Sequence, residues 1–248
     1  MASIPLSVSA IDALKKEVRR FYDERKSSHL TEALASALGF NTHAALLTAL
    51  KASGPEPLYC LLNEEKFDAR MQAFGYLPDP EFIFEDAKTP EMIGTDCSYA
   101  YGIHYKTNRQ KAWRNLMVSA VNEALRRRLF SLRPGDNRWP GHDDQYRTSY
   151  LFDFVLPCGL PARVALHDAG FDELSVHVAV NPKGDRVRFF ESGLSAGDAF
   201  GATWLERQRG AWIQSVDDSF RCRRSIIDTL IDMKVEPLGY GDRGRLIM

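Results

Sequence analysis

The chain has 248 residues, of which 44% are hydrophobic, and a formal net charge of −1 at pH 7. This length can bury a substantial core in one domain or two. The charge excludes a global attraction to nucleic acid or to an anionic membrane, so any charge-driven binding has to be local. The four cysteines have no short metal-ligand spacing, which predicts reduced thiols in a cytoplasmic protein. Neither a signal peptide nor an apolar run of membrane-spanning length is present, so we expect no membrane partner.

Three amphipathic helices are predicted within residues 1–54. Their N-caps are Ser9 for the first, Ser27 or Ser28 for the second and Thr42 for the third. The second and third helices together have the pattern of a helix-turn-helix. The third helix reads HAALLTALKA, whereas helices that read DNA present Arg, Gln, Asn or Lys to the bases. We therefore favour a small helical packing unit, with sequence-specific DNA reading as the alternative.

Residues 11–52 also resemble a known family. A basic helix is followed by SHLTEALASALGFNTHAALLTAL, which has spaced leucines, a Leu-Gly-Phe turn and a capped apolar helix. This pattern is similar to the short helical module called glyoxalase-related, found at the N-termini of uncharacterised proteins on plasmids, integrative elements and phages. The resemblance implies a mobile genetic element, where accessory proteins manage the element's DNA or blunt host defences. It implies no metal ligands and no active site.

Residues 55–100 are predicted to form a helix and an acidic connection. Asn63 caps the helix, and from Leu77 onward the chain is rich in Pro, Asp and Glu. Two aromatic residues in this acidic stretch, Phe82 and Phe84, indicate that it docks on some surface rather than extending freely into solvent. The alternative function of the stretch is a phosphate-mimicking surface that competes for a basic nucleic-acid groove.

The longest predicted helix runs from Thr107 to about Leu132 and is strongly basic outside its apolar stripe. Its basic side chains, those that follow it and a nearby indole make it the candidate site for a partner or nucleic acid. Arginine binds phosphate and carboxylate groups in a planar fork, and tryptophan stacks on bases. The alternative is a solvated or internally paired face. The candidate residues are Arg109, Lys111, Arg114, Arg126, Arg127, Arg128, Arg133, Arg138 and Trp139.

Residues 148–191 alternate with period two, which predicts four short antiparallel strands. A tight turn after the third strand would pair Val180 with Val187 and Val178 with Phe189. The segment that follows is predicted to be helical, from Ser195 or Asp198 to about Trp212 and again from Asp217 or Ser219. The tail from Gly239 to Met248 is expected to add an edge strand or to bind a partner by strand addition.

No catalytic constellation stands out. His142-Asp143-Asp144 is the most suggestive local run, but three adjacent residues rarely converge on one metal ion. On the polar face of the strands, Asp153 is expected near Arg163 and His167, as an acid–base pair or a salt-bridge patch. We place His177 on the order of 15 Å from His167, at ~3.3 Å per residue, which argues against a metal site there. Phosphate-binding, nucleophile-elbow and zinc-protease motifs are absent.

The sequence thus predicts an α+β fold with three parts. These are a helical, helix-turn-helix-like lobe (1–54), a helix with an acidic connection (55–100), and a domain (101–248) in which helices pack a four-stranded antiparallel meander. The leading hypothesis is a non-catalytic binding protein of a mobile genetic element that acts on a nucleoprotein complex, such as an inhibitor of a host CRISPR effector complex. A protein partner is favoured, with nucleic acid as the alternative, and no cofactor or metal is expected. Other candidates are a DNA-binding plasmid maintenance or regulatory protein and a metal-dependent hydrolase or nuclease.

Overall fold

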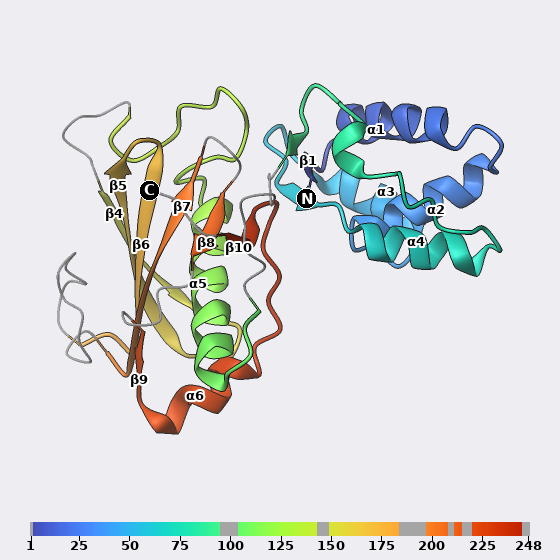
Figure 1. The fold of residues 1–248 in the computed structure, drawn as a ribbon. Helices are drawn as coiled ribbons and strands as arrows, with labels where there is room; N and C mark the ends of the chain where they lie inside the picture. The colour runs from blue at the N-terminus through green and yellow to red at the C-terminus, as the bar shows by residue number, and fades with distance from the viewer. Residues whose placement is uncertain are drawn as a thin grey trace. The chain divides into compact units, whose positions relative to one another are not determined.

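The chain forms two compact units in the computed structural model (Figure 1). Unit 1 comprises Met1–Thr95 with Leu238–Tyr240, and unit 2 comprises Asp96–Pro237 with Gly241–Met248. Both units contain helices and antiparallel strands, so the α+β class is confirmed. The structure describes residues 2–94, 104–142, 149–183, 197–207, 211–214 and 220–244.

Four helices form most of unit 1: α1 (Val8–Phe21), α2 (Ser27–Ala37), α3 (His43–Ala52) and α4 (Glu64–Ala73). Thr42 caps α3 and Asn63 caps α4 through side-chain oxygens that accept backbone N–H groups, as predicted. The cap of α1 is Ser7 rather than Ser9. The predicted cap at Ser27 or Ser28 is wrong, because α2 follows Lys26, which forms no side-chain cap.

The turn between α2 and α3 depends on Gly39, whose φ of +85° lies in the left-handed region that favours glycine. Both helices lie where the sequence predicted them. A helix-turn-helix arrangement, however, is not shown. The core of the unit is built instead from the buried faces of the helices, with Leu14, Leu34 and Leu46 each at most 1% exposed.

A three-stranded antiparallel sheet completes unit 1 and was not predicted. Its strands lie in the order β2 (Tyr59–Leu61), β1 (Ala2–Pro5) and β3 (Ile93–Gly94), with Ile4 opposite Cys60. All four residues of β1 are buried, so this strand lacks the alternation that marks a half-exposed strand.

The acidic stretch after α4 belongs to unit 1 and docks by its aromatic side chains, as predicted. Phe82 is 8% exposed, and Phe84 is fully buried at the start of a short 3-10 helix, η1 (Phe84–Asp86). Their rings contact each other and Phe67 of α4 with centroid distances of 5.2 to 5.7 Å. These contacts hold the chain against the helices while its carboxylates stay at the surface.

Unit 2 is organised around a five-stranded antiparallel sheet rather than the predicted four-stranded meander. The strands lie in the order β4 (Ser149–Val155), β5 (Pro161–Gly170), β6 (Glu173–Val180), β7 (Ala199–Glu206) and β9 (Arg221–Cys222). The first three strands and the pairing of Asp153 with Arg163 are confirmed.

The predicted pairs Val180–Val187 and Val178–Phe189 are wrong. One edge of β6 pairs with β5. At its other edge, Val180 pairs with Ala199 of β7 and Val178 with Gly201 of β7. The predicted fourth strand itself lies outside the described residues. β7 therefore occupies the position beside β6 that the sequence analysis gave to residues 187–191.

The helix predicted from Ser195 or Asp198 to Trp212 is also wrong, since β7 and the short strand β8 (Trp212–Gln214) occupy this region. β7 lies between two strands and is almost wholly buried, as β6 is, but its sequence, AFGATWLE, lacks polar alternation and gives no period-two signal. The tail adds the strand β10 (Gly241–Gly244), which pairs in parallel with β8, as one of the two predictions for it expected.

Two helices pack in the described part of unit 2, α5 (Asn108–Arg126) and α6 (Arg224–Ile231). Figure 1 shows α5 lying along one face of the sheet, where Gly201 leaves room for Trp113 and Met117. The Trp113 indole donates a hydrogen bond to the carbonyl of Ala202 at 3.1 Å. α5 ends six residues before the predicted Leu132, because Arg128 adopts a φ of +58° and its N–H bonds back to Leu125.

Candidate interaction surface

The predicted basic residues at the start of α5 separate into exposed and buried ones. Thr107 caps the helix in a reciprocal capping box with Gln110, which fixes the first turn. Arg109 and Lys111 are exposed. Arg114 points inward instead, and only 12% of its side chain is exposed. Arg114 therefore forms contacts inside unit 2 and is not available to a partner.

The basic residues at the end of α5 are largely paired within the protein. Glu123 accepts from Arg127 at 2.8 Å and lies 3.8 Å from Arg126. Arg127 also donates to the carbonyl of Asp153 at 2.7 Å and lies over the Phe152 ring, 4.8 Å from its centroid. The predicted Arg126–Arg128 cluster is thus exposed but partly neutralised.

The residues after α5 do not present a stacking platform. Trp139 is 5% exposed. The Phe130 ring meets it edge-on, with 5.9 Å between the ring centroids, and the Arg207 guanidinium lies over the Trp139 ring, 5.6 Å from its centroid. Arg138 is bound to Asp136 at 2.6 Å, whereas Arg133 is exposed. Because its faces are covered, Trp139 cannot stack on a base in this structure.

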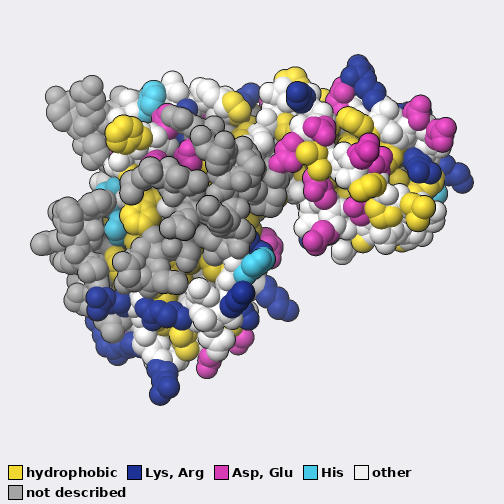
Figure 2. Space-filling model, in the orientation of Figure 1, with side chains coloured by type: hydrophobic (Ala, Val, Ile, Leu, Met, Phe, Trp, Pro, Cys, Tyr) yellow, Lys and Arg dark blue, Asp and Glu magenta, His cyan; other side chains and the backbone are white. Residues whose placement is uncertain are grey.

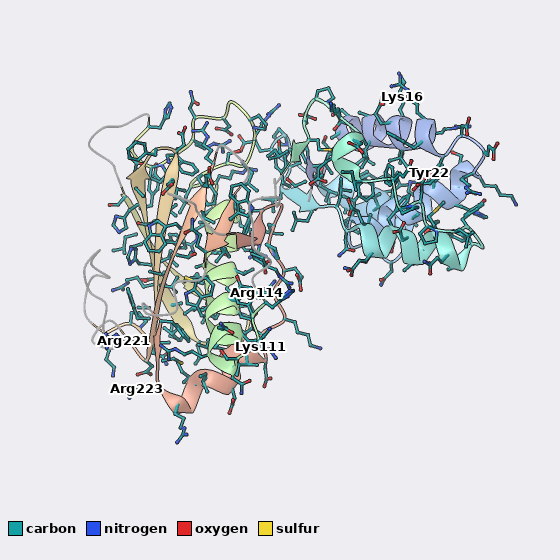
Figure 3. All side chains as sticks on the ribbon, viewed as in Figure 1. Lys16, Tyr22, Lys111, Arg114, Arg221 and Arg223 are labelled. Atoms are coloured by element: carbon teal, nitrogen blue, oxygen red, sulfur yellow. The ribbon has the colours of Figure 1, made fainter. Side chains whose placement is uncertain are left out.

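The structure places Arg109 next to the segment that carries three further arginines, a segment that the sequence analysis assigned to a separate helix. We call Arg109, Arg221, Arg223 and Arg224 the basic end of unit 2. The Arg109 guanidinium lies 5.0 Å from the centroid of Phe220, which directly precedes β9. Figure 2 shows Lys and Arg side chains gathered where β9 and α6 lie, and Figure 3 labels Arg221 and Arg223 there.

The half-buried thiol of Cys222 also indicates that these segments are close together. Burial raises the pKa of Cys222 to about 11. The positive charge of Arg109 lowers this pKa, and the negative charge of Asp198 raises it. A side chain on α5 is thus within electrostatic reach of one on β9. The run Arg-Cys-Arg-Arg was visible in the sequence, but its proximity to Arg109 was not.

The basic end carries little compensating charge among the residues that the structure describes. All four arginines are exposed, and Asp198 contacts one of them, Arg223, at 3.1 Å. Arg221 and Arg224 form no ion pair with any described residue. Exposed guanidinium groups without a carboxylate partner can bind phosphate or carboxylate groups through two parallel hydrogen bonds.

The polar face of the sheet differs from the prediction in its histidines. His167 pairs with Ser175 and His177 with Ala165, so the two imidazoles are diagonal neighbours with ring centroids 5.7 Å apart. The predicted separation on the order of 15 Å is wrong. Burial and the neighbouring His167 lower the pKa of His177 to about 4, and burial also lowers that of His167.

The predicted acid–base pair of Asp153 with His167 is not formed. Asp153 lies opposite Arg163, four residues along β5 from His167, which is about 13 Å at ~3.3 Å per residue. Arg163 donates to Asp153 at 2.6 Å, and this hydrogen bond lowers the pKa of the carboxyl despite a small opposing effect of burial. The pair is a salt bridge, as the alternative prediction stated.

Other candidate chemistry finds no support in the described ranges. Of the run His142-Asp143-Asp144, only His142 lies within them. No group of three or more His, Cys, Asp or Glu side chains there is arranged to hold a metal ion. Cys60, Cys158 and Cys222 are free thiols, and burial raises the pKa of Cys60 to about 11. On α3, most exposed positions carry Ala44, Ala45, Leu47 and Thr48, which offer few contacts to bases.

Comparison of the chain with family models, curated proteins and solved structures finds no match. The resemblance of residues 11–52 to the glyoxalase-related module therefore stays a prediction. Among the described residues, no helix has the length and apolar character needed to cross a membrane.

Proposed function

We propose that the protein is a non-catalytic binding protein of a mobile genetic element, which acts on a nucleoprotein complex through the basic end of unit 2. The observation that carries this proposal is the run of exposed arginines Arg221, Arg223 and Arg224 at β9 and the start of α6, next to which Arg109 of α5 lies over the Phe220 ring. Clustered like charges repel one another and oppose folding, so such a cluster is maintained at a cost in stability. A binding surface for phosphate or carboxylate groups accounts for that cost.

The distribution of charge between the units supports a composite partner. Residues 1–95 contain 10 Lys and Arg against 14 Asp and Glu, a net charge of −4. Residues 96–248 contain 22 against 19, a net charge of +3, and the two values together give the −1 of the whole chain. A complex of nucleic acid and basic protein offers complementary charge to both units.

The state of the titratable groups supports binding rather than catalysis. Asp153 is occupied by Arg163, and His177 is buried with its pKa far from neutrality. A general acid or base acts best with a pKa near the working pH and within reach of a substrate. In its concrete form, the proposal is inhibition of a host defence complex such as a CRISPR effector, a setting that rests on the module resemblance.

The experiment that tests this proposal is affinity capture from a host lysate, with and without nuclease, read by mass spectrometry. We expect one multi-protein complex, accompanied by its nucleic acid, whose proteins are still recovered after nuclease treatment. Recovery that collapses with nuclease would replace the proposal with direct nucleic-acid binding. A blank in both arms would contradict both.

A further inference from the structure

A groove in unit 1 shares no residue with the basic end of unit 2 and has the lining of a ligand site. It encloses about 310 Å³ between α1 and α2. Pockets for small ligands begin at about 300 Å³. The lining residues are Lys15, Lys16, Arg19, Ser27, Leu30, Thr31 and Leu34.

The cationic side of the groove comes from one helix. Lys16 and Arg19 of α1 are exposed and form no ion pair with any described residue, and Lys16 stands on the outer side of α1 in Figure 3. Lys15 is already engaged, with its ammonium 3.7 Å from Asp12 and 3.4 Å from the Nε2 atom of His43. Two cations are thus left to bind an anion, in a unit whose net charge is otherwise acidic.

The opposite side of the groove offers hydroxyl groups and an apolar floor. Ser27 and Thr31 lie one helical turn apart on α2, and Thr31 donates its own hydroxyl proton to the Ser27 carbonyl at 2.7 Å. Leu30 and Leu34, 4% and 1% exposed, form the floor. Ser27 is also the first residue of α2, whose first turn has no side-chain cap, so the partial positive charge there adds to that of the cations.

We propose that this groove binds a small phosphorylated ligand of nucleotide size. The phosphate would contact Lys16 and Arg19, the hydroxyl of Ser27 would add a hydrogen bond, and an apolar or aromatic group would lie on Leu30 and Leu34. The lining combines a few convergent polar groups with apolar side chains, as small-molecule sites do. This site is independent of the basic end, because it lies in the other unit and shares no residue with it.

The test is isothermal titration calorimetry of the full chain at low salt with three probes: AMP, inorganic phosphate and adenosine. We expect AMP to bind with a dissociation constant of about 1 mM or tighter. Phosphate and adenosine should each bind several-fold more weakly, since each keeps only one half of the contacts. Absence of AMP binding at concentrations of about 10 mM would overturn the proposal.

A matched pair of variants assigns the binding to the groove. Lys16→Ala/Arg19→Ala removes both unpaired cations and should weaken AMP binding by about tenfold or more, since each charge-assisted hydrogen bond contributes strongly. The control is Arg20→Ala on the same helix, where Arg20 is paired with Glu17 at 2.7 Å and does not line the groove.

Each outcome decides one part of the proposal. Equal AMP affinity in Lys16→Ala/Arg19→Ala and wild type would overturn the site. AMP binding no tighter than phosphate would overturn the assignment of an apolar group to the floor. A Ser27→Ala variant removes the hydroxyl and introduces a residue of higher helix propensity, so it should weaken AMP binding by a few-fold without lowering thermal stability.

Discussion

Arg114 and Asp242 form an almost buried ion pair that connects α5 to β10. The Nε atom of Arg114 lies 2.6 Å from an Asp242 carboxylate oxygen, and the two side chains are 12% and 8% exposed. Arg114 also donates to the carbonyl of Val235, and Tyr105 donates to that of Asp242. Burial alone would lower the pKa of Arg114, but Asp242 and then Glu236 raise it above its ordinary value.

Asp242→Asn should destabilise unit 2 by about 2–4 kcal/mol, because it removes the closest counter-ion of the buried Arg114 charge and leaves only the largely exposed Glu236, at 3.4 Å. All four tryptophans lie in unit 2, so fluorescence during urea unfolding reports the free energy of unfolding of this unit alone. The double variant Arg114→Met/Asp242→Asn should be less destabilised than the sum of the single variants. Arg126→Met, on the exposed face of the same helix, is the control and should change stability by about 0.5 kcal/mol or less. A loss for Asp242→Asn no larger than that of the control would contradict this role.

The hairpin between β5 and β6 stores strain that a substitution should release. Phe171 and Asp172 both adopt left-handed backbone conformations, with φ of +55° and +60°, and Phe171 is 93% exposed. Two-residue hairpin turns of this geometry favour Asn-Gly, whereas a bulky residue there costs about 1–2 kcal/mol.

Phe171→Asn/Asp172→Gly should therefore raise the free energy of unfolding of unit 2 by about 1 kcal/mol in urea unfolding. Phe171→Ala removes the same ring without relieving the backbone, so it should leave stability nearly unchanged. An unchanged or lower stability of the Asn-Gly variant would show that the turn is not strained.

Because His177 is buried, the free energy of unfolding of unit 2 should fall with decreasing pH already between pH 6.5 and 4, before most carboxylates are protonated. The pKa of His177 is about 4 when folded, against an ordinary value of 6.5. The unfolded chain binds the proton first as pH falls, so the stabilising contribution is complete above pH 6.5 and is lost as pH falls towards 4. The loss over this window amounts to about 2–3 kcal/mol.

His177→Gln, which does not titrate, should flatten this part of the stability profile. The measurement is urea unfolding at intervals between pH 7 and pH 4.5, comparing wild type with the variant. Parallel profiles would mean that His177 has the same pKa in the folded and unfolded states, which would contradict the burial of a neutral imidazole.

Strands β4, β5 and β6 were predictable because two kinds of residue alternate along their sequences, most clearly in β6, where Glu173, Ser175 and His177 alternate with Leu174, Val176 and Val178. This pattern also fixed the register that pairs Asp153 with Arg163. β7 is as buried as β6, but its sequence, AFGATWLE, lacks the polar alternation of β6 and reads as an apolar run that resembles a buried helix. Four-residue β1 carried no pattern at all.

The candidate surfaces were harder to predict than the strands. The sequence showed the arginines near residues 109 and 221, but the contact between α5 and β9 depends on tertiary packing and leaves no local signal. Counting residues along the chain overestimated the distance between His167 and His177. The two residues lie on neighbouring antiparallel strands and are diagonal neighbours across them. Burial of Trp139 likewise depends on Phe130 and Arg207, and cannot be inferred from a basic neighbourhood.

The central claim is that the basic end of unit 2 binds the partner complex, and charge reversal tests it most directly. Arg221→Glu/Arg224→Glu reverses two exposed charges, and a glutamate at the first position of α6 favours the helix dipole, so this variant should fold. The control, Lys51→Glu/Lys66→Glu, reverses two exposed charges in unit 1. Captured from nuclease-treated lysate, the complex should be recovered by wild type and the control, and reduced by about tenfold or more with Arg221→Glu/Arg224→Glu. Equal recovery with all three proteins would contradict the claim.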